Sequence, residues 1–310
     1  MGHEVIMKPR ALMILSFCAT FFSCNLPEWN QDRLNNKLHR NQISEHFFKT
    51  EKSTLHYYAG GSGPPVLLLH GFGGDAQITW HKTMSELVKA NTVIAPDLLW
   101  FGKSQSTLPP NIQSQAAEII SLIDYLKVDT FYLAGISYGG FVSLEIFLEI
   151  GLRVEKLCLI DSPGITYEVT NLDSLAKETD VSNFTEIFVT ENPQAVQRLM
   201  DLAFYRDKKI PKSILKKTYD LYFDQNHYEL EKLLTSLVSY QKKFGKEKHL
   251  IYPPTLIIWG REDDVFPLSE GKKLADHMNA EFYIIDKAGH APNIEQFDSF
   301  IYAFKNFMIN

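Results

Sequence analysis

Gly135-Ile136-Ser137-Tyr138-Gly139-Gly140 is the stretch with the strongest structural signal in this chain. It follows the apolar run 131–135, which has the composition of a buried strand, and precedes a helical pattern from Tyr138 to about Ile150. Glycines two residues before and two residues after a serine let a strand and a helix approach closely around a sharp turn. We therefore predict that Ser137 is held in a strained turn at the carboxyl end of a strand.

Short apolar runs alternate with helical patterns on both sides of this turn. The alternation predicts βαβ units around a mostly parallel sheet, and continuous apolar runs favour strands covered by helices on both faces. Residues 46–49 and 54–58 predict an antiparallel hairpin at the sheet edge. The expected core strands are 65–70, 92–95, 131–135, 157–160, 255–259 and 281–285, and the last helix is expected over about 293–307. Ligands of such sheets bind beyond the carboxyl ends of the strands.

Composition limits the class of protein. Hydrophobic residues make up 45% of the 310 residues and charged residues 22%, as in ordinary globular chains. The net charge of −6 gives a polyanion no electrostatic attraction, so no nucleic-acid partner is expected. A small or lipidic partner is favoured instead.

A base for the serine is expected among the ten histidines. A serine hydroxyl is a weak nucleophile unless a base accepts its proton, and on this kind of sheet the chain order is nucleophile, acid, histidine. His290 follows the last expected strand, within Lys287-Ala-Gly-His290-Ala-Pro-Asn-Ile-Glu295, and is our choice. The histidines with less suitable positions are His70, which belongs to another motif, and His227, His249 and His277.

The acid that orients this histidine is expected after the strand 255–259. The segment Trp259-Gly-Arg-Glu-Asp263-Asp264 offers three adjacent carboxylates, of which we choose Asp263. Asp264 and Glu262 are local alternatives. Asp161 is a distant alternative, because it ends the strand after the helix that follows Ser137.

Donors for an oxyanion are expected from backbone amides. The loop His70-Gly71-Phe72-Gly73-Gly74 follows the first core strand, so the N–H groups of Phe72 and Tyr138 would face the reacting carbonyl. No Lys-Ser or Lys-Thr pair follows the glycines, which disfavours a phosphate-binding loop.

The first 24 residues have the pattern of a signal peptide, with Lys8 and Arg10 before an apolar stretch over 11–22. The stretch ends at Ser23-Cys24, which is similar to a bacterial lipobox, so Cys24 is a candidate for lipidation. A plain secretory signal, or a buried N-terminal helix without processing, stays open. Residues 25–43 are polar and are expected to form a tether.

Only three cysteines occur, so no disulfide framework is expected. Cys158 lies inside an apolar run, which favours a buried structural thiol.

Taken together, these motifs resemble the α/β-hydrolase superfamily over about Ser44 to Asn310, and within it the monoacylglycerol-lipase-like esterase branch. The superfamily resemblance rests on 70–74, 96–104, 135–140, 254–260 with Asp263 and Pro267, and 288–290; the branch resemblance rests on 192–205 with Ile210-Pro211. It implies a mostly parallel central sheet with helices on both faces, a helical cap inserted over about 165–252, and a domain spanning 44–310. It also implies a triad of Ser137, Asp263 and His290 without a metal or organic cofactor.

The resemblance implies an enzyme that hydrolyses carboxylic esters, with monoacylglycerols or other lipidic esters as expected substrates. A carbon–carbon bond hydrolase of the meta-cleavage type is the second hypothesis, and a non-catalytic receptor on the same fold is the third. With the signal and Cys24, the expected location is the bacterial cell envelope with a lipid anchor in the membrane, and the alternatives are secretion or the cytoplasm. Eight aromatic residues of the expected cap are candidates for the acyl pocket: Phe184, Phe188, Phe204, Tyr205, Tyr219, Tyr222, Phe223 and Tyr228.

Overall fold

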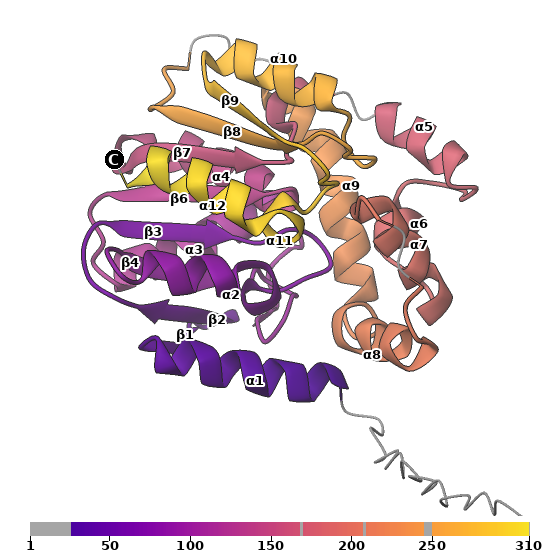
Figure 1. Cartoon of the computed structure of the whole chain (residues 1–310), viewed down its shortest axis with the longest axis horizontal. Helices are drawn as coiled ribbons and strands as arrows, with labels where there is room; N and C mark the ends of the chain where they lie inside the picture. The colour runs from indigo at the N-terminus through magenta and orange to yellow at the C-terminus, as the bar shows by residue number, and fades with distance from the viewer. Residues whose placement is uncertain (1–25, 168–169, 207–208, 245–249, 310) are drawn as a thin grey trace, which may run out of the picture.

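A computed structural model describes residues 26–167, 170–206, 209–244 and 250–309. In this part of the chain a nine-stranded sheet runs in the order β1-β2-β4-β3-β6-β7-β8-β9, with β5 paired to β2 (Figure 1). The strands are β1 Ile43–Lys49, β2 Ser53–Gly60, β3 Pro65–Leu69, β4 Thr92–Pro96, β5 Gln105–Ser106, β6 Phe131–Ile136, β7 Val154–Ile160, β8 Thr255–Gly260 and β9 Glu281–Ile285. β1 and β2 form the predicted antiparallel edge hairpin, and β4, β3 and β6 to β9 are parallel. The predicted α/β-hydrolase sheet is confirmed.

Helices cover both faces of this sheet, as the continuous apolar runs predict. Alternate residues of β3 point to opposite sides: Leu67 and Leu69 join one buried cluster, whereas Val66 and Leu68 join the other. The first cluster includes α3 (Ile112–Tyr125), α4 (Tyr138–Ile150) and α10 (Leu268–Met278). The second includes α1 (Leu26–Arg40), α2 (Ala76–Leu87) and α12 (Phe297–Met308), of which α2 and α12 lie in front of the sheet in Figure 1.

The N-terminal region differs from the expected tether over 25–43. Its described part is the helix α1, and Leu38 on that helix is 1% exposed in the second core cluster. The Tyr58 hydroxyl donates a hydrogen bond to the Asn35 side chain at 2.9 Å, which fixes the helix to β2. Leu34 and Leu38 lie one turn apart, so this mostly polar helix has a narrow apolar stripe, and Leu38 packs on the domain. The expected signal segment and Cys24 lie outside the described residues.

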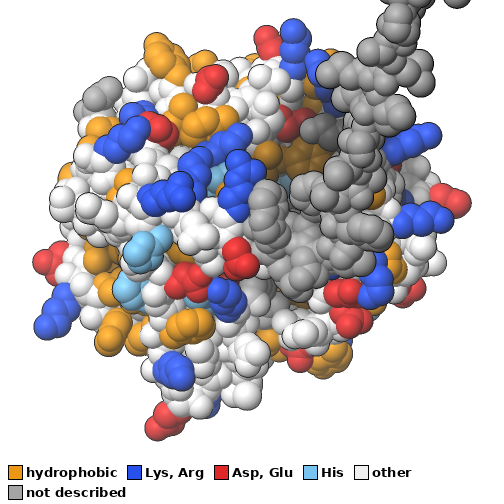
Figure 2. All heavy atoms as spheres, turned by 60° about the horizontal axis from the view of Figure 1, so that its bottom comes forward, with side chains coloured by type: hydrophobic (Ala, Val, Ile, Leu, Met, Phe, Trp, Pro, Cys, Tyr) orange, Lys and Arg blue, Asp and Glu red, His pale blue; other side chains and the backbone are white. Residues whose placement is uncertain are grey.

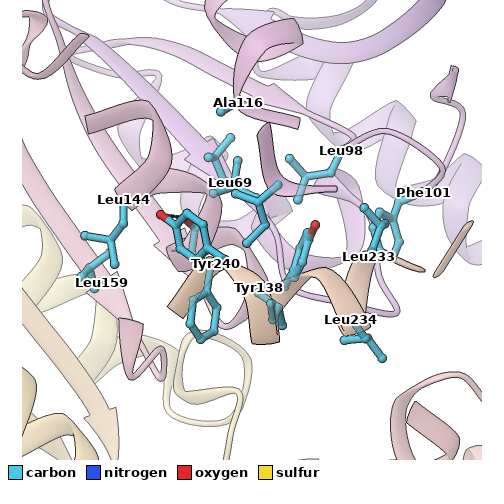
Figure 3. Packing of buried hydrophobic residues seen from close by; sticks show 14 of the residues in the cluster. Leu69, Leu98, Phe101, Ala116, Tyr138, Leu144, Leu159, Leu233, Leu234 and Tyr240 are labelled. Carbon is cyan, nitrogen blue, oxygen red and sulfur yellow. Dashed lines mark hydrogen bonds between the residues drawn. The ribbon is translucent and has the colours of Figure 1, made fainter. Parts of the chain in front are cut away.

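Between β7 and β8 the described residues form helices rather than strands. They are η2 Gly164–Thr166, α5 Thr170–Glu178, α6 Thr185–Phe188, α7 Pro193–Ala203, α8 Lys212–Tyr222 and α9 His227–Phe244. Figure 3 shows Leu233, Leu234 and Tyr240 of α9 beside Phe101 and Tyr138 of the core, and all five belong to one buried cluster. The helical insertion is therefore packed directly on the sheet domain.

The C-terminal helix is interrupted where one continuous helix is predicted. The chain forms α11 (Pro292–Glu295), breaks at Gln296 with φ −126° and ψ 54°, and continues as α12. The short helix η1 (Gly151–Arg153) links α4 to β7.

The surface carries both signs of charge. On the face shown in Figure 2, Lys and Arg side chains are interspersed with Asp and Glu, and hydrophobic side chains lie between them. None of the helices in the described ranges has the length and hydropathy to cross a membrane.

Candidate active site

Ser137 occupies the turn between β6 and α4, with φ 52° and ψ −120°. A positive φ is costly for a residue with a side chain, and here the neighbouring glycines make the turn possible. A Cβ on Gly135 would collide with the backbone oxygen of Gly139, and a Cβ on Gly139 would collide with the carbonyls of Leu69 and His70. The predicted strained turn is confirmed.

The three side chains expected to act together form one chain of hydrogen bonds. His290 Nε2 lies 2.8 Å from Ser137 Oγ, and His290 Nδ1 lies 2.9 Å from Asp263 Oδ2. Because a carboxylate accepts, Nδ1 carries the proton, which leaves Nε2 to accept from the serine hydroxyl. The residues follow the parallel strands β6, β8 and β9, whose carboxyl ends lie at the same edge of the sheet and bring the three side chains together.

Asp263 is held by its own loop. Its side chain is fully buried, and its Oδ1 accepts hydrogen bonds from Val265 N–H at 2.8 Å and Phe266 N–H at 3.0 Å. The Phe266 ring stands edge-on to the His290 ring, with 5.3 Å between centroids. Loop backbone and ring packing therefore fix the carboxylate and the imidazole relative to each other.

The alternative acids make other contacts. Glu262 accepts a hydrogen bond from Ala288 N–H at 3.1 Å, and Asp161 accepts one from Gly260 N–H at 2.8 Å. Glu262 thereby supports the loop that carries the histidine. In the described ranges, no group of three or more His, Cys, Asp or Glu side chains could hold a metal ion.

The histidine of the glycine-rich loop is structural. His70 is fully buried, and its Nε2 accepts from Leu98 N–H at 2.9 Å, so Nδ1 donates to the Gly71 carbonyl at 2.7 Å. Burial lowers the pKa of His70, which favours this neutral form. His227 and His277 lie on α9 and α10, and His249 is outside the described residues.

Two contacts that the sequence analysis missed join the His290 loop to the helical insertion. His290 N–H donates to the Ala203 carbonyl at the end of α7 at 2.9 Å. Glu295 accepts from Gly289 N–H at 2.8 Å and from Tyr205 N–H at 3.1 Å. No periodicity signals a link between segments about ninety residues apart, although Glu295 belongs to the quoted His290 motif.

The two expected oxyanion donors lie on either side of the serine. Tyr138 is the first residue of α4, where N–H groups lack partners within the helix. Gly71 is close enough that a Cβ there would lie 3.2 Å from Ser137 Cβ, and the Phe72 ring packs edge-on against Tyr138 at 5.8 Å. No described residue accepts a hydrogen bond from the Phe72 N–H.

An apolar cavity of about 200 Å³ opens beside Ser137 and His290. Its walls come from the 71–74 loop, from α2, from α6 and α7, and from the His290 loop. Apart from His290 itself, no ionisable side chain is among the lining residues: Gly71, Phe72, Gly73, Gly74, Ile78, Thr79, Ile136, Ser137, Phe188, Leu199, Met200, Ala203, Phe204, Val265, Ala291, Asn293 and Ile294. Of the eight aromatic candidates, Phe188 and Phe204 line this cavity.

This chain belongs to the α/β hydrolase fold family, whose sequence profile matches residues 64–297. It is 28% identical to 2-hydroxy-6-oxo-2,4-heptadienoate hydrolase of Pseudomonas putida F1, over 80% of this chain and 90% of that protein. It is 27% identical to human monoacylglycerol lipase ABHD6, over 76% of this chain and 72% of the relative. Among solved structures, a candidate lipase from Acinetobacter baumannii AYE superposes with a TM-score of 0.78 at 22% identity, covering 90% and 95% of the two chains. The relatives thus include both a hydrolase of a 2-hydroxy-6-oxo-dienoate and a monoacylglycerol lipase.

Proposed function

We propose that this protein is a serine hydrolase that cleaves carboxylic esters with an apolar acyl group. Ser137 is the nucleophile, His290 the general base and Asp263 the acid that orients the base. The observation that carries the proposal is the hydrogen-bonded chain from Asp263 through His290 to Ser137, which ends in an uncharged apolar cavity.

The residues provide each step of acyl transfer. Ser137 Oγ attacks the ester carbonyl while His290 Nε2 takes its proton, and the imidazolium then protonates the leaving alcohol. Asp263 keeps Nδ1 protonated and stabilises the imidazolium. The N–H groups of Phe72 and Tyr138 stabilise the oxyanion, a contribution of about 10²–10³ in rate for each such donor. Water then attacks the acyl-enzyme with His290 again as base.

The lack of a cationic side chain in the cavity lining favours a neutral ester over 2-hydroxy-6-oxo-2,4-heptadienoate, after which the Pseudomonas relative is named. That substrate is a dienoate, which carries a carboxylate, and burying a carboxylate without a cationic partner is costly. No Lys or Arg lines the described cavity. Carbon–carbon bond hydrolysis remains the second candidate because the relative is 28% identical over 80% of this chain.

We also propose that the ester is lipidic and that the protein works at a membrane of the bacterial cell envelope, anchored at Cys24. The support is the resemblance of 192–205 to the corresponding segment of monoacylglycerol lipases, together with the signal-like N-terminal sequence.

The test is turnover by the purified protein of four substrate sets: p-nitrophenyl esters of increasing length, monoacylglycerols, lysophospholipids and a 2-hydroxy-6-oxo-dienoate. We expect ester cleavage and little turnover of the dienoate. Ser137→Ala should fold normally, lose nearly all activity and no longer react with a fluorophosphonate probe, whereas Ser162→Ala should still be labelled. Retention of more than about a tenth of kcat by Ser137→Ala would refute the nucleophile, and preferred dienoate turnover would establish the second candidate.

A further inference from the structure

A second buried carboxyl group, Asp161, lies behind the Asp263 carboxylate. Asp161 directly follows β7, has a positive φ of 42° and is 0% exposed. Its Oδ1 accepts a hydrogen bond from Gly260 N–H at 2.8 Å, at the end of the adjacent strand β8. Asp263 lies three residues after Gly260, and a hydrogen-bond contact between the two side chains brings the two carboxyl groups side by side at the ends of β7 and β8.

The two carboxyl groups have unequal partners. Asp263 accepts three hydrogen bonds, from two backbone N–H groups and from His290. Asp161 accepts one, and no described group donates to its buried Oδ2. Two adjacent buried carboxyl groups cannot both be ionised without a large electrostatic cost, so the group with fewer donors retains a proton.

Burial is the largest cause, and the negative charge of Asp263 the second, of a pKa of Asp161 that lies well above its ordinary value. Glu295 adds a further negative charge, and a hydrogen bond between the two aspartates stabilises the protonated form in the same sense. A proton on Oδ2 gives this otherwise unpaired atom a partner, because it then donates to Asp263.

We propose that Asp161 is a positioning residue, which stays protonated at neutral pH and donates a hydrogen bond to Asp263, so that Asp263 stays ionised and aligned with His290. Asp161 is not among the residues that line the cavity, and the base bonded to Ser137 Oγ is His290. The inference rests on the proposed function, since it concerns the same hydrogen-bonded chain.

The variants Asp161→Asn and Asp161→Leu separate this role from packing. The asparagine amide can accept from Gly260 and donate to Asp263, so we expect ester kcat close to wild type. Leucine removes the donor: kcat should fall by about tenfold to a hundredfold with little change in KM. The acid limb of the pH profile should also move to higher pH in the leucine variant, because a carboxylate without this donor binds the imidazolium more strongly. If Asp161 only supported packing, the acid limb of the pH profile would stay at the same pH in the leucine variant.

Infrared difference spectra give a readout that is independent of activity. Wild type at pH 7 should show the carbonyl band of a protonated carboxyl group that is missing in Asp161→Asn, and this comparison holds even if the leucine variant does not fold. The absence of that band, or wild-type kcat and pH profile in a folded leucine variant, would overturn the inference.

The rate at which a fluorophosphonate labels Ser137 distinguishes the two proposals. If wild type hydrolyses no ester, yet shows the band and is labelled faster than Asp161→Leu, the role of Asp161 stands and only the proposed ester substrate fails.

Discussion

Two of the eight described residues other than glycine that have positive φ lie where the proposed chemistry takes place. Ser137 and Asp161 both have positive φ, and they end the neighbouring strands β6 and β7. Such a conformation costs about 1–3 kcal/mol and persists only when the surrounding structure enforces it. Here backbone hydrogen bonds to the neighbouring strands hold both turns, from Ser137 N–H to the Ile160 carbonyl at 2.9 Å and from Asp161 N–H to the Ile258 carbonyl at 3.0 Å. The sheet therefore supports the site energetically as well as geometrically.

The first prediction concerns the orienting acid. Asp263→Asn should lower kcat by about 10⁴, because an amide stabilises the wrong histidine tautomer. Steady-state kinetics on a p-nitrophenyl ester measure the effect, and Asp264→Asn is the matched control one residue away. An equal loss in both variants would mean that the loop, rather than the carboxylate at 263, matters.

The second prediction concerns a buried carboxylate outside the proposed triad. Asp75 caps α2 by accepting from Ile78 N–H at 2.7 Å, and it accepts from the Tyr222 hydroxyl of α8 at 3.0 Å. Burial, together with the charge of Asp97, raises its pKa to about 6. The folded protein therefore binds this proton more tightly than the unfolded chain, so the free energy of unfolding falls as pH rises from about 4 through 6.

Asp75→Asn should remove this pH-dependent fall in the free energy of unfolding, because the amide does not ionise. The amide oxygen can still accept from Ile78 N–H and cap α2. The variant should gain stability over wild type above pH 6, by about 2 kcal/mol, and differ little near pH 4. Urea unfolding at several pH values measures the difference, with the exposed Asp220→Asn as control. A stability difference that is constant with pH would contradict the cause given for the raised pKa.

At the scale of elements, α7 serves two purposes. Its end binds the His290 loop through the Ala203 carbonyl, and its Leu199 and Met200 line the cavity. The helix that limits the cavity is thus hydrogen-bonded to the loop that carries the base, and a displacement of α7 would alter both.

The third prediction concerns Met200, which α7 contributes to the cavity lining. Met200→Ala enlarges the cavity, so the preferred acyl length should move to longer chains and kcat/KM for the shortest esters should fall. A series of p-nitrophenyl esters reports the change, and Gln194→Ala on an exposed position of the same helix should leave the preference unchanged. An unaltered length profile in Met200→Ala would exclude this cavity as the acyl site.

Elements also differ in how far the sequence predicts them. The strands and the turn at Ser137 were predictable because continuous apolar runs and closely spaced glycines reflect local constraints. The helix α1 was missed, since Leu34 and Leu38 give it only a narrow apolar stripe whose partner lies elsewhere in the chain. The contacts of Glu295 and Ala203 were missed for the same reason: they depend on how distant segments pack.

For the whole molecule, α1 places the start of the described chain on the side of the helical insertion. Figure 1 shows the Leu26 end of α1 next to α8, and Gln31 lines a pocket together with Asp220 and Tyr222 of α8. Leu26 is two residues after Cys24. An anchor at Cys24 would therefore hold the insertion, rather than the opposite end of the sheet, towards the lipid surface.

The fourth prediction tests that anchor. In a bacterial host, the wild-type protein should incorporate a palmitate analogue and partition into detergent, whereas Cys24→Ser should do neither, because several acyl chains bind a membrane firmly and none remain in the variant. Cys18→Ser, within the expected signal, is the control and should behave as wild type. Unlabelled wild-type protein in the aqueous phase would disprove the anchor.

The buried thiol of β7 offers a way to follow unfolding of the sheet itself. Cys158 is free and 0% exposed at the centre of the fold, and burial raises its pKa. Only the thiolate reacts with alkylating reagents, so the folded sheet protects this sulfur both sterically and chemically. Alkylation of Cys158 therefore requires β7 to become exposed. The alkylation rate then measures how often this strand, which lies between those that precede the proposed nucleophile and its acid, separates from the sheet.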